Sequence, residues 1–166
     1  TDKTAFELLF ETMEEQAKTG KPFFTSIYTY GTHMSFDSPD QKFGAGKHFL
    51  LNRFYNFDYY FKEFLQKFEN SSLADNTILV FTADHATFED SDFKLSYPDY
   101  PRANPDVDTM PFFIYHKGIQ AETINAEGRN SLSMAPTLLD YLDIDEPNYF
   151  LGQSLFYYRS EERRVG

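Results

Sequence analysis

The sequence predicts an α/β fold in which a mostly parallel β-sheet is flanked by helices. Helix-like and strand-like segments follow one another in the order helix, strand, helix, strand, strand, helix, which is typical of layered α/β proteins. Residues 77–83 (TILVFTA) are apolar on both faces, as in an interior strand that helices cover on both sides. Aromatic residues make up 19% of the chain, and rings in this number favour thick packed layers over disorder.

Three helices are indicated by apolar residues at helical spacing. The first is expected over residues 4–18, before the breakers Gly20 and Pro22. The longest is expected over residues 47–68, where Phe recurs at steps of three and four and favours a helix lying on a sheet over a coiled coil. The third is expected over residues 133–142, with Ser133 as its N-terminal cap.

Strands are expected wherever β-branched and aromatic residues cluster between turn residues. The expected strands are residues 23–30 (FFTSIYTY), 77–83, 110–116 (MPFFIYH) and a short last strand over 152–158. Residues 84–107 lie between two of them as a long acidic stretch rich in Tyr and Pro, and a connection of this length within a domain is commonly functional.

Length and composition bound the class of protein. The 166 residues are the size of one domain, so residues 1–166 are expected to form a single domain. The absence of cysteine excludes disulfides, thiolate metal sites and a cysteine nucleophile. A net charge of −11 disfavours nucleic acid as a partner. The sequence has no initiator Met and begins within a helical pattern, so we expect a piece of a longer polypeptide.

Asp84 and His85 directly follow the apolar segment 77–83. In open α/β sheets the functional crevice lies at the carboxyl ends of the strands. A chain that turns into a loop there can direct one carboxylate and one imidazole to the same divalent cation. The alternative from the residues alone is an aspartate that caps the following turn and a histidine on the surface.

Four stretches together resemble the sulfatase and alkaline phosphatase superfamily. They are PFFTSIYTYGTHMSF (22–36), NFDYYFKEFLQKFENSSLADNTILVFTADHA (56–86), MPFFIY (110–115) and MAPTLLDYLDI (134–144). Within this superfamily the chain looks most like the extracytoplasmic domains of lipoteichoic acid synthases and phosphoglycerol transferases. The resemblance implies an alkaline phosphatase-like fold, of which this chain is the C-terminal portion.

The resemblance also implies roles for three residues. Asp84 and His85 match the aspartate and histidine that bind the catalytic metal, and His33 matches a histidine that faces the phosphoryl or sulfuryl oxygens of the substrate. The family's nucleophile and its remaining acidic metal ligand lie upstream of the region that this chain matches, so no catalytic residue is assigned here. Oxygen and nitrogen ligands favour Mn²⁺ or Zn²⁺ over Mg²⁺ as the one divalent metal. The chain departs from the family pattern at Ser35, Ala86 and Ser133, where relatives often carry Pro, Gly and Asp.

The implied function is part of a metal-dependent transferase of phosphoglycerol or phosphoethanolamine. Its substrates would be a phospholipid head group or an envelope glycan, at the extracytoplasmic face of a bacterial membrane to which an N-terminal part anchors the intact protein. The chain alone is expected to be inactive. Two alternatives stay open: a sulfatase or phosphodiesterase that transfers to water, and a non-catalytic module that binds through Tyr97 and Tyr100.

Other charged residues and histidines receive structural interpretations. His48 and His116 are expected at the ends of elements, and the acidic residues after the Asp84–His85 pair are expected to form a solvated loop. Lys94 and Arg102 are the cations of that loop that could meet a phosphate.

Overall fold

The computed structural model describes residues 1–33, 39–102, 104, 107–147 and 149–157. They form two compact units, Thr1–Gly118 and Ile119–Gly166, and each unit is described by itself. The expectation of a single domain over residues 1–166 stays a prediction.

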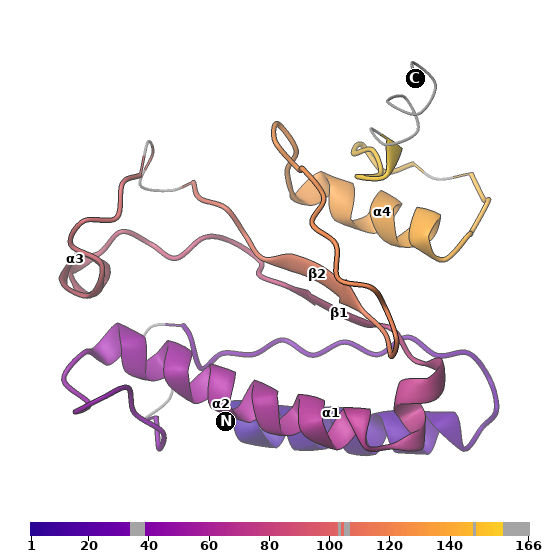
Figure 1. Ribbon diagram of the computed structural model, residues 1–166, viewed down its shortest axis with the longest axis horizontal. Helices are drawn as coiled ribbons and strands as arrows, with labels where there is room; N and C mark the ends of the chain where they lie inside the picture. Colours follow the sequence, from indigo (N-terminus) through magenta and orange to yellow (C-terminus); the bar gives the residue numbers. More distant parts are fainter. Residues whose placement is uncertain (34–38, 103, 105–106, 148, 158–166) are drawn as a thin grey trace. The chain divides into compact units, whose positions relative to one another are not determined.

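Helices α1 (Asp2–Ala17) and α2 (Phe49–Glu69) lie side by side in the first unit (Figure 1). They confirm the helices expected over residues 4–18 and 47–68. The hydroxyl of Thr1 accepts a hydrogen bond from the Thr4 N–H and so caps α1. Apolar side chains from both helices and from the 3₁₀ turn Ser72–Asn76 form the buried core. Its buried members are Phe6, Phe10, Met13, Tyr60, Phe64, Phe68, Leu73 and Ala74.

Strands β1 (Leu79–Thr82) and β2 (Phe112–Tyr115) form one antiparallel pair and lie over the two helices (Figure 1). Phe81 is paired with Phe113, and their rings stack with centroids 4.9 Å apart. Phe61 of α2 lies 5.1 Å from the ring of Phe81. The long helix therefore packs on a sheet face, as its spacing predicts.

The sheet differs from the prediction of a mostly parallel sheet. Among the described residues it has two strands, and these are antiparallel. Strand β1 is also not interior, because Val80 is 41% exposed while Leu79 and Phe81 face the helices. An apolar run shows that a strand is able to be buried on both faces. It does not show that a second layer of helices packs on the other face.

Two expected strands are not found. Residues 23–30 pair with no described strand, although their burial alternates along the chain as in a strand. A strand is defined by hydrogen bonds to a neighbouring strand. The residue types of one segment do not determine whether such a neighbour is present. Residues 152–156 are irregular, with a bend and a turn and no strand, and Tyr158 lies outside the described residues.

A short helix, α3 (Ser91–Ser96), lies within the acidic stretch that was expected to be a loop. In the second unit, α4 (Met134–Tyr141) confirms the helix expected over residues 133–142. Ser133 is its N-cap residue, but the hydroxyl makes no capping hydrogen bond, since a 3₁₀ turn (Ser131–Ser133) leads directly into the helix. None of the helices in the described ranges is both long and apolar enough to cross a membrane.

Candidate functional site

The side chains of Asp84 and His85 converge just beyond the end of β1. Asp84 Oδ2 lies 3.6 Å from His85 Nε2, and Asp84 Oδ1 accepts a hydrogen bond of 2.9 Å from the His85 backbone N–H. Both side chains are about half exposed, at 46% and 50%. The two groups therefore face one another at a surface that a ligand can reach.

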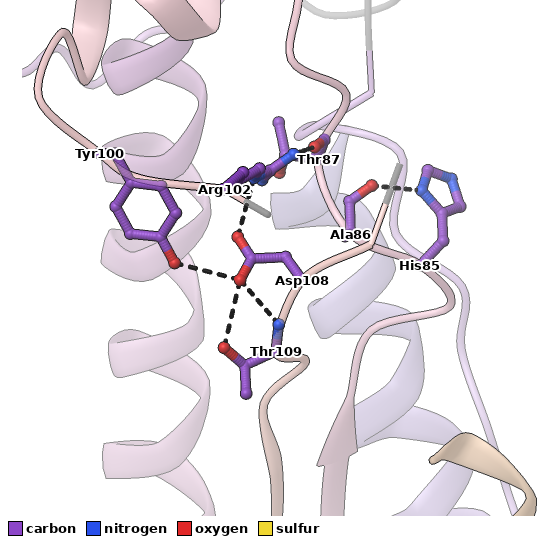
Figure 2. A network of polar contacts seen from close by, with 7 residues as sticks. All are labelled: His85, Ala86, Thr87, Tyr100, Arg102, Asp108 and Thr109. Atoms are coloured by element: carbon purple, nitrogen blue, oxygen red, sulfur yellow. Dashed lines mark hydrogen bonds and ion pairs between the residues drawn. The ribbon is translucent and has the colours of Figure 1, made fainter. Parts of the chain in front are cut away.

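The orientation of the His85 ring is set by two neighbours. Its Nδ1 lies 2.7 Å from the carbonyl oxygen of Ala86 (Figure 2). A carbonyl only accepts, so Nδ1 carries the proton of this hydrogen bond, and in the neutral imidazole the lone pair is on Nε2. The ring of Phe88 lies 5.1 Å from that of His85. The nitrogen that faces Asp84 is thus the one that can bind a metal.

Asp84 receives a second hydrogen bond, from the hydroxyl of Tyr28 to Oδ2. This bond, together with the nearby His85 and its backbone N–H, holds the pKa of Asp84 below its ordinary value although partial desolvation acts the other way. The same hydrogen bond raises the pKa of Tyr28. Asp84 is therefore an anion, and Tyr28 a neutral donor, at neutral pH.

The pair fits two positions of a metal site. Divalent metals bind imidazole nitrogen and carboxylate oxygen at about 2.0–2.2 Å, so two donor atoms up to about 4 Å apart can share one ion. The separation of 3.6 Å lies within this limit. A catalytic site takes about three protein ligands, and no group of three or more His, Asp or Glu side chains that could hold a metal occurs among the described residues. Further ligands would have to come from elsewhere.

His33 lies at the end of a segment whose backbone is fixed at Gly31. The Gly31 N–H donates to Oδ1 of Asp2, which is 2% exposed, and a Cβ at Gly31 would come within 1.9 Å of the other carboxylate oxygen. His33 is exposed, and its N–H donates to the Tyr30 carbonyl at 2.9 Å. It is Tyr28 that links this segment to Asp84. The role of His33 stays a prediction, and Ser35 lies outside the described residues.

A cavity of about 420 Å³ borders this site. Its wall includes Tyr28, the donor to Asp84, and its full lining is Thr1, Asp2, Ala5, Tyr28, Thr29, Tyr30 and Gly31. Its volume lies in the range of small-molecule sites.

A buried ion pair holds the chain that follows His85 (Figure 2). Arg102, whose side chain is 4% exposed, donates from Nε to Asp108 Oδ2 at 2.9 Å and from a terminal nitrogen to the carbonyl oxygen of Thr87. Its guanidinium lies 4.3 Å from the centre of the Phe93 ring. Arg102 is thus occupied in the fold, and the expectation that it could meet a substrate phosphate stays a prediction.

Asp108 is the acceptor at the centre of this network. Burial alone would raise the pKa of Asp108, but the Thr109 N–H, the Tyr100 hydroxyl and the Arg102 guanidinium outweigh it and hold the pKa below its ordinary value. The carboxylate is therefore charged and partnered at neutral pH, and the ion pair ties Thr87, two residues after His85, to the start of the segment that leads into β2.

The acidic residues after the pair also have structural partners. Asp90 Oδ1 accepts the Phe93 N–H at 2.8 Å and caps α3. Asp92 lies 3.5 Å from Arg53 of α2, and Glu89 lies 3.7 Å from Lys94. These contacts support the structural interpretation of the acidic cluster over a second cation site.

The family model described as Sulfatase matches residues 1–144. The chain belongs to the sulfatase family. It is 29% identical over 157 residues to the lipoteichoic acid synthase-like protein YvgJ of Bacillus subtilis (strain 168), a match that covers 81% of this chain and 25% of the relative. It is 33% identical over 81 residues to a 2,3-bisphosphoglycerate-independent phosphoglycerate mutase of Antithamnion sp., covering 48% of this chain and 15% of the relative.

The sulfatase-family chain thus spans a quarter or less of the length of these two curated relatives. No solved structure matches it at a significant level. The family match confirms the resemblance seen in the sequence and supports an alkaline phosphatase-like α/β fold.

Two asparagines that position a loop of this sulfatase-family chain were missed from the sequence. Asn52, 5% exposed, accepts the Phe43 N–H and donates to the Gly46 carbonyl, each at 3.0 Å. One turn along α2, Asn56 accepts the Gln41 N–H at 3.1 Å. The signal was available, since polar residues four apart on the buried face of an amphipathic helix require partners.

Proposed function

We propose that Asp84 and His85 are two ligands of one divalent metal in a phosphoryl-group transferase, and that His33 binds the phosphoryl oxygens of its substrate. The observation that carries this proposal is the convergence of Asp84 Oδ2 and His85 Nε2, 3.6 Å apart, in a chain of the sulfatase family. The metal is Mn²⁺ or Zn²⁺ in preference to Mg²⁺, because the donor set includes imidazole.

The residues of this chain supply binding and orientation. Asp84 provides a carboxylate kept ionised by its hydrogen bonds, and His85 provides Nε2, with its ring held in place through Nδ1. When bound, a divalent metal polarises a phosphoryl oxygen and activates a nucleophile. As the family resemblance implies, the proposed nucleophile and remaining acidic ligand lie upstream of the region that this chain matches, and the proposal therefore includes that this chain alone is inactive.

The proposed substrates are esters of phosphate in the cell envelope. The transferred group is phosphoglycerol or phosphoethanolamine, its donor a phospholipid head group and its acceptor an envelope lipid or glycan. The name of the lipoteichoic acid synthase-like relative supports the envelope substrates, and the name of the phosphoglycerate mutase supports phosphoryl chemistry alone. The site then lies at the extracytoplasmic face of a bacterial membrane, which the protein reaches through an anchor outside the described helices.

The test measures turnover by the full-length protein with Asp84→Asn, His85→Ala and the matched control Asp58→Asn, which changes an exposed aspartate of α2. Substrates are labelled phosphatidylglycerol, a nitrophenyl phosphodiester and a nitrophenyl sulfate. We expect each site variant to lower kcat/KM at least about 100-fold, since a catalytic metal contributes several kcal/mol, and the control to match the wild type.

Wild-type turnover by the two site variants would contradict the proposal. Hydrolysis of the sulfate ester with no reaction of either phosphodiester would favour the sulfatase alternative. The description of the matching family, Sulfatase, supports that alternative.

A further inference from the structure

Tyr28 contacts the same carboxylate oxygen of Asp84 that faces His85. Its hydroxyl donates to Oδ2, although the two residues are 56 positions apart in the sequence. The other oxygen, Oδ1, is held by the His85 backbone N–H at 2.9 Å. Each carboxylate oxygen thus has its own donor, one from the local backbone and one from a remote segment.

The position of the Tyr28 ring is itself fixed. The ring of Tyr30 packs edge-on against it with centroids 4.7 Å apart. Three positions after Tyr28, the Gly31 N–H donates to the buried carboxylate of Asp2, which anchors the segment to α1. Tyr28 is 52% exposed. Its contribution to the site therefore comes from its hydroxyl and not from burial of its ring.

The hydroxyl leaves Oδ2 able to act as a ligand. An ionised carboxylate offers about four lone-pair sites on its two oxygens, and the Tyr28 hydrogen bond uses one of the sites on Oδ2. The bond opposes rotation of the carboxylate away from His85. Hydrogen bonds of this kind to metal-binding carboxylates set the orientation of the ligand.

We propose that Tyr28 is a positioning residue whose hydroxyl holds Asp84 Oδ2 toward His85 and thereby strengthens metal binding by the pair. The inference rests on the proposed function, since it assigns Tyr28 a task only if Asp84 and His85 bind a metal. It adds a residue from the segment that carries His33, so the metal pair and the expected phosphate-binding loop are coupled through one hydrogen bond.

The test compares Mn²⁺ affinity of the metal-free full-length protein as wild type, Tyr28→Phe, Tyr30→Phe and His85→Ala, by electron paramagnetic resonance of free Mn²⁺. Tyr28→Phe keeps the ring and removes the hydroxyl, and we expect its Kd for Mn²⁺ to rise 10- to 100-fold, the usual cost of such a partner. Tyr30→Phe makes the same chemical change on the neighbouring ring and is expected to bind as the wild type. The thermal midpoint of each metal-free variant is measured alongside.

The outcomes separate the two proposals. Loss of binding in His85→Ala with unchanged affinity in Tyr28→Phe would overturn the role of Tyr28 and leave the metal pair standing. Wild-type affinity in His85→Ala would overturn the proposed function, and the role of Tyr28 with it. Equal weakening by Tyr28→Phe and Tyr30→Phe, or a matching fall in thermal midpoint, would show a packing effect and would also overturn the positioning role.

Discussion

Two regions of the first unit are held together by different contacts. One is the aromatic layer, made by the Phe rings of α1, α2 and β1, and the other is the segment beyond β1, residues 84–109. In the layer, rings from α1 and α2 pack directly on one another, with Phe64 and Phe68 only 5% and 0% exposed. Beyond β1 the chain is held by hydrogen bonds and an ion pair around Arg102, with Phe93 the one buried apolar side chain among the described residues of 84–109.

This difference separates two tasks. Apolar contacts are non-directional, so the aromatic layer holds β1 against α2 but does not determine where the next side chains point. Hydrogen bonds are directional, so the Tyr28 and Ala86 contacts determine the directions of Asp84 and His85. Stability should therefore depend most on the layer, and function on single polar atoms beyond it.

The largest loss of stability is expected in the aromatic layer. Phe64→Ala should lower the free energy of unfolding by about 3–5 kcal/mol, because it removes a buried ring and leaves a cavity. The matched control is Phe24→Ala, since Phe24 is 88% exposed, and its effect should stay within about 0.5 kcal/mol. Urea denaturation followed by circular dichroism measures both. Similar losses in the two variants would remove the distinction between layer and surface.

A smaller loss is expected from the ion pair beyond β1. Arg102→Ala should lower the free energy of unfolding by about 3 kcal/mol, because it leaves the carboxylate of Asp108 partly buried without its cation. The control is Lys117→Ala, which breaks a shorter (2.6 Å) but exposed pair with Asp75 and should cost at most about 1 kcal/mol. Urea denaturation measures the loss of free energy of unfolding in both variants. A loss in Arg102→Ala no larger than that in Lys117→Ala would contradict the account.

The Arg102 pair also has a signature in pH. The folded-state pKa of Asp108 is below its ordinary value, so its contribution is present above the unfolded pKa of about 3.9 and is lost as pH falls through the lower folded pKa. The stability difference between wild type and Arg102→Ala should accordingly shrink in that acid range. A difference that stays constant through it would assign the effect of Arg102 to packing on Phe93 instead.

The fold was predictable where one segment carries its own signal. Helices α1, α2 and α4 follow from the spacing of apolar residues, and β1 and β2 from apolar runs between turn residues. The relative direction of the strands, antiparallel instead of parallel, was not predictable, because it depends on which segments pair with one another. Residues 23–30 have the alternation of a strand but no described pairing partner, and their own sequence does not say whether one is present.

The site was predictable to the same extent. Asp84 and His85 could be placed at a strand end from sequence, because only Ala83 separates them from β1. The contacts that orient them could not, since Tyr28 is 56 residues away from Asp84 and Arg102 is 15 residues away from Thr87. No local pattern distinguishes Tyr28 from Tyr30, the other tyrosine of residues 23–30.

The central claim is that Asp84 and His85 hold one cation between them. The most direct measurement is an anomalous difference map from crystals of the full-length protein grown with Mn²⁺. We expect one peak within about 2.2 Å of both Asp84 Oδ2 and His85 Nε2, the bonding distance for such ligands. A peak bound elsewhere, with neither atom within bonding distance of it, would contradict the account.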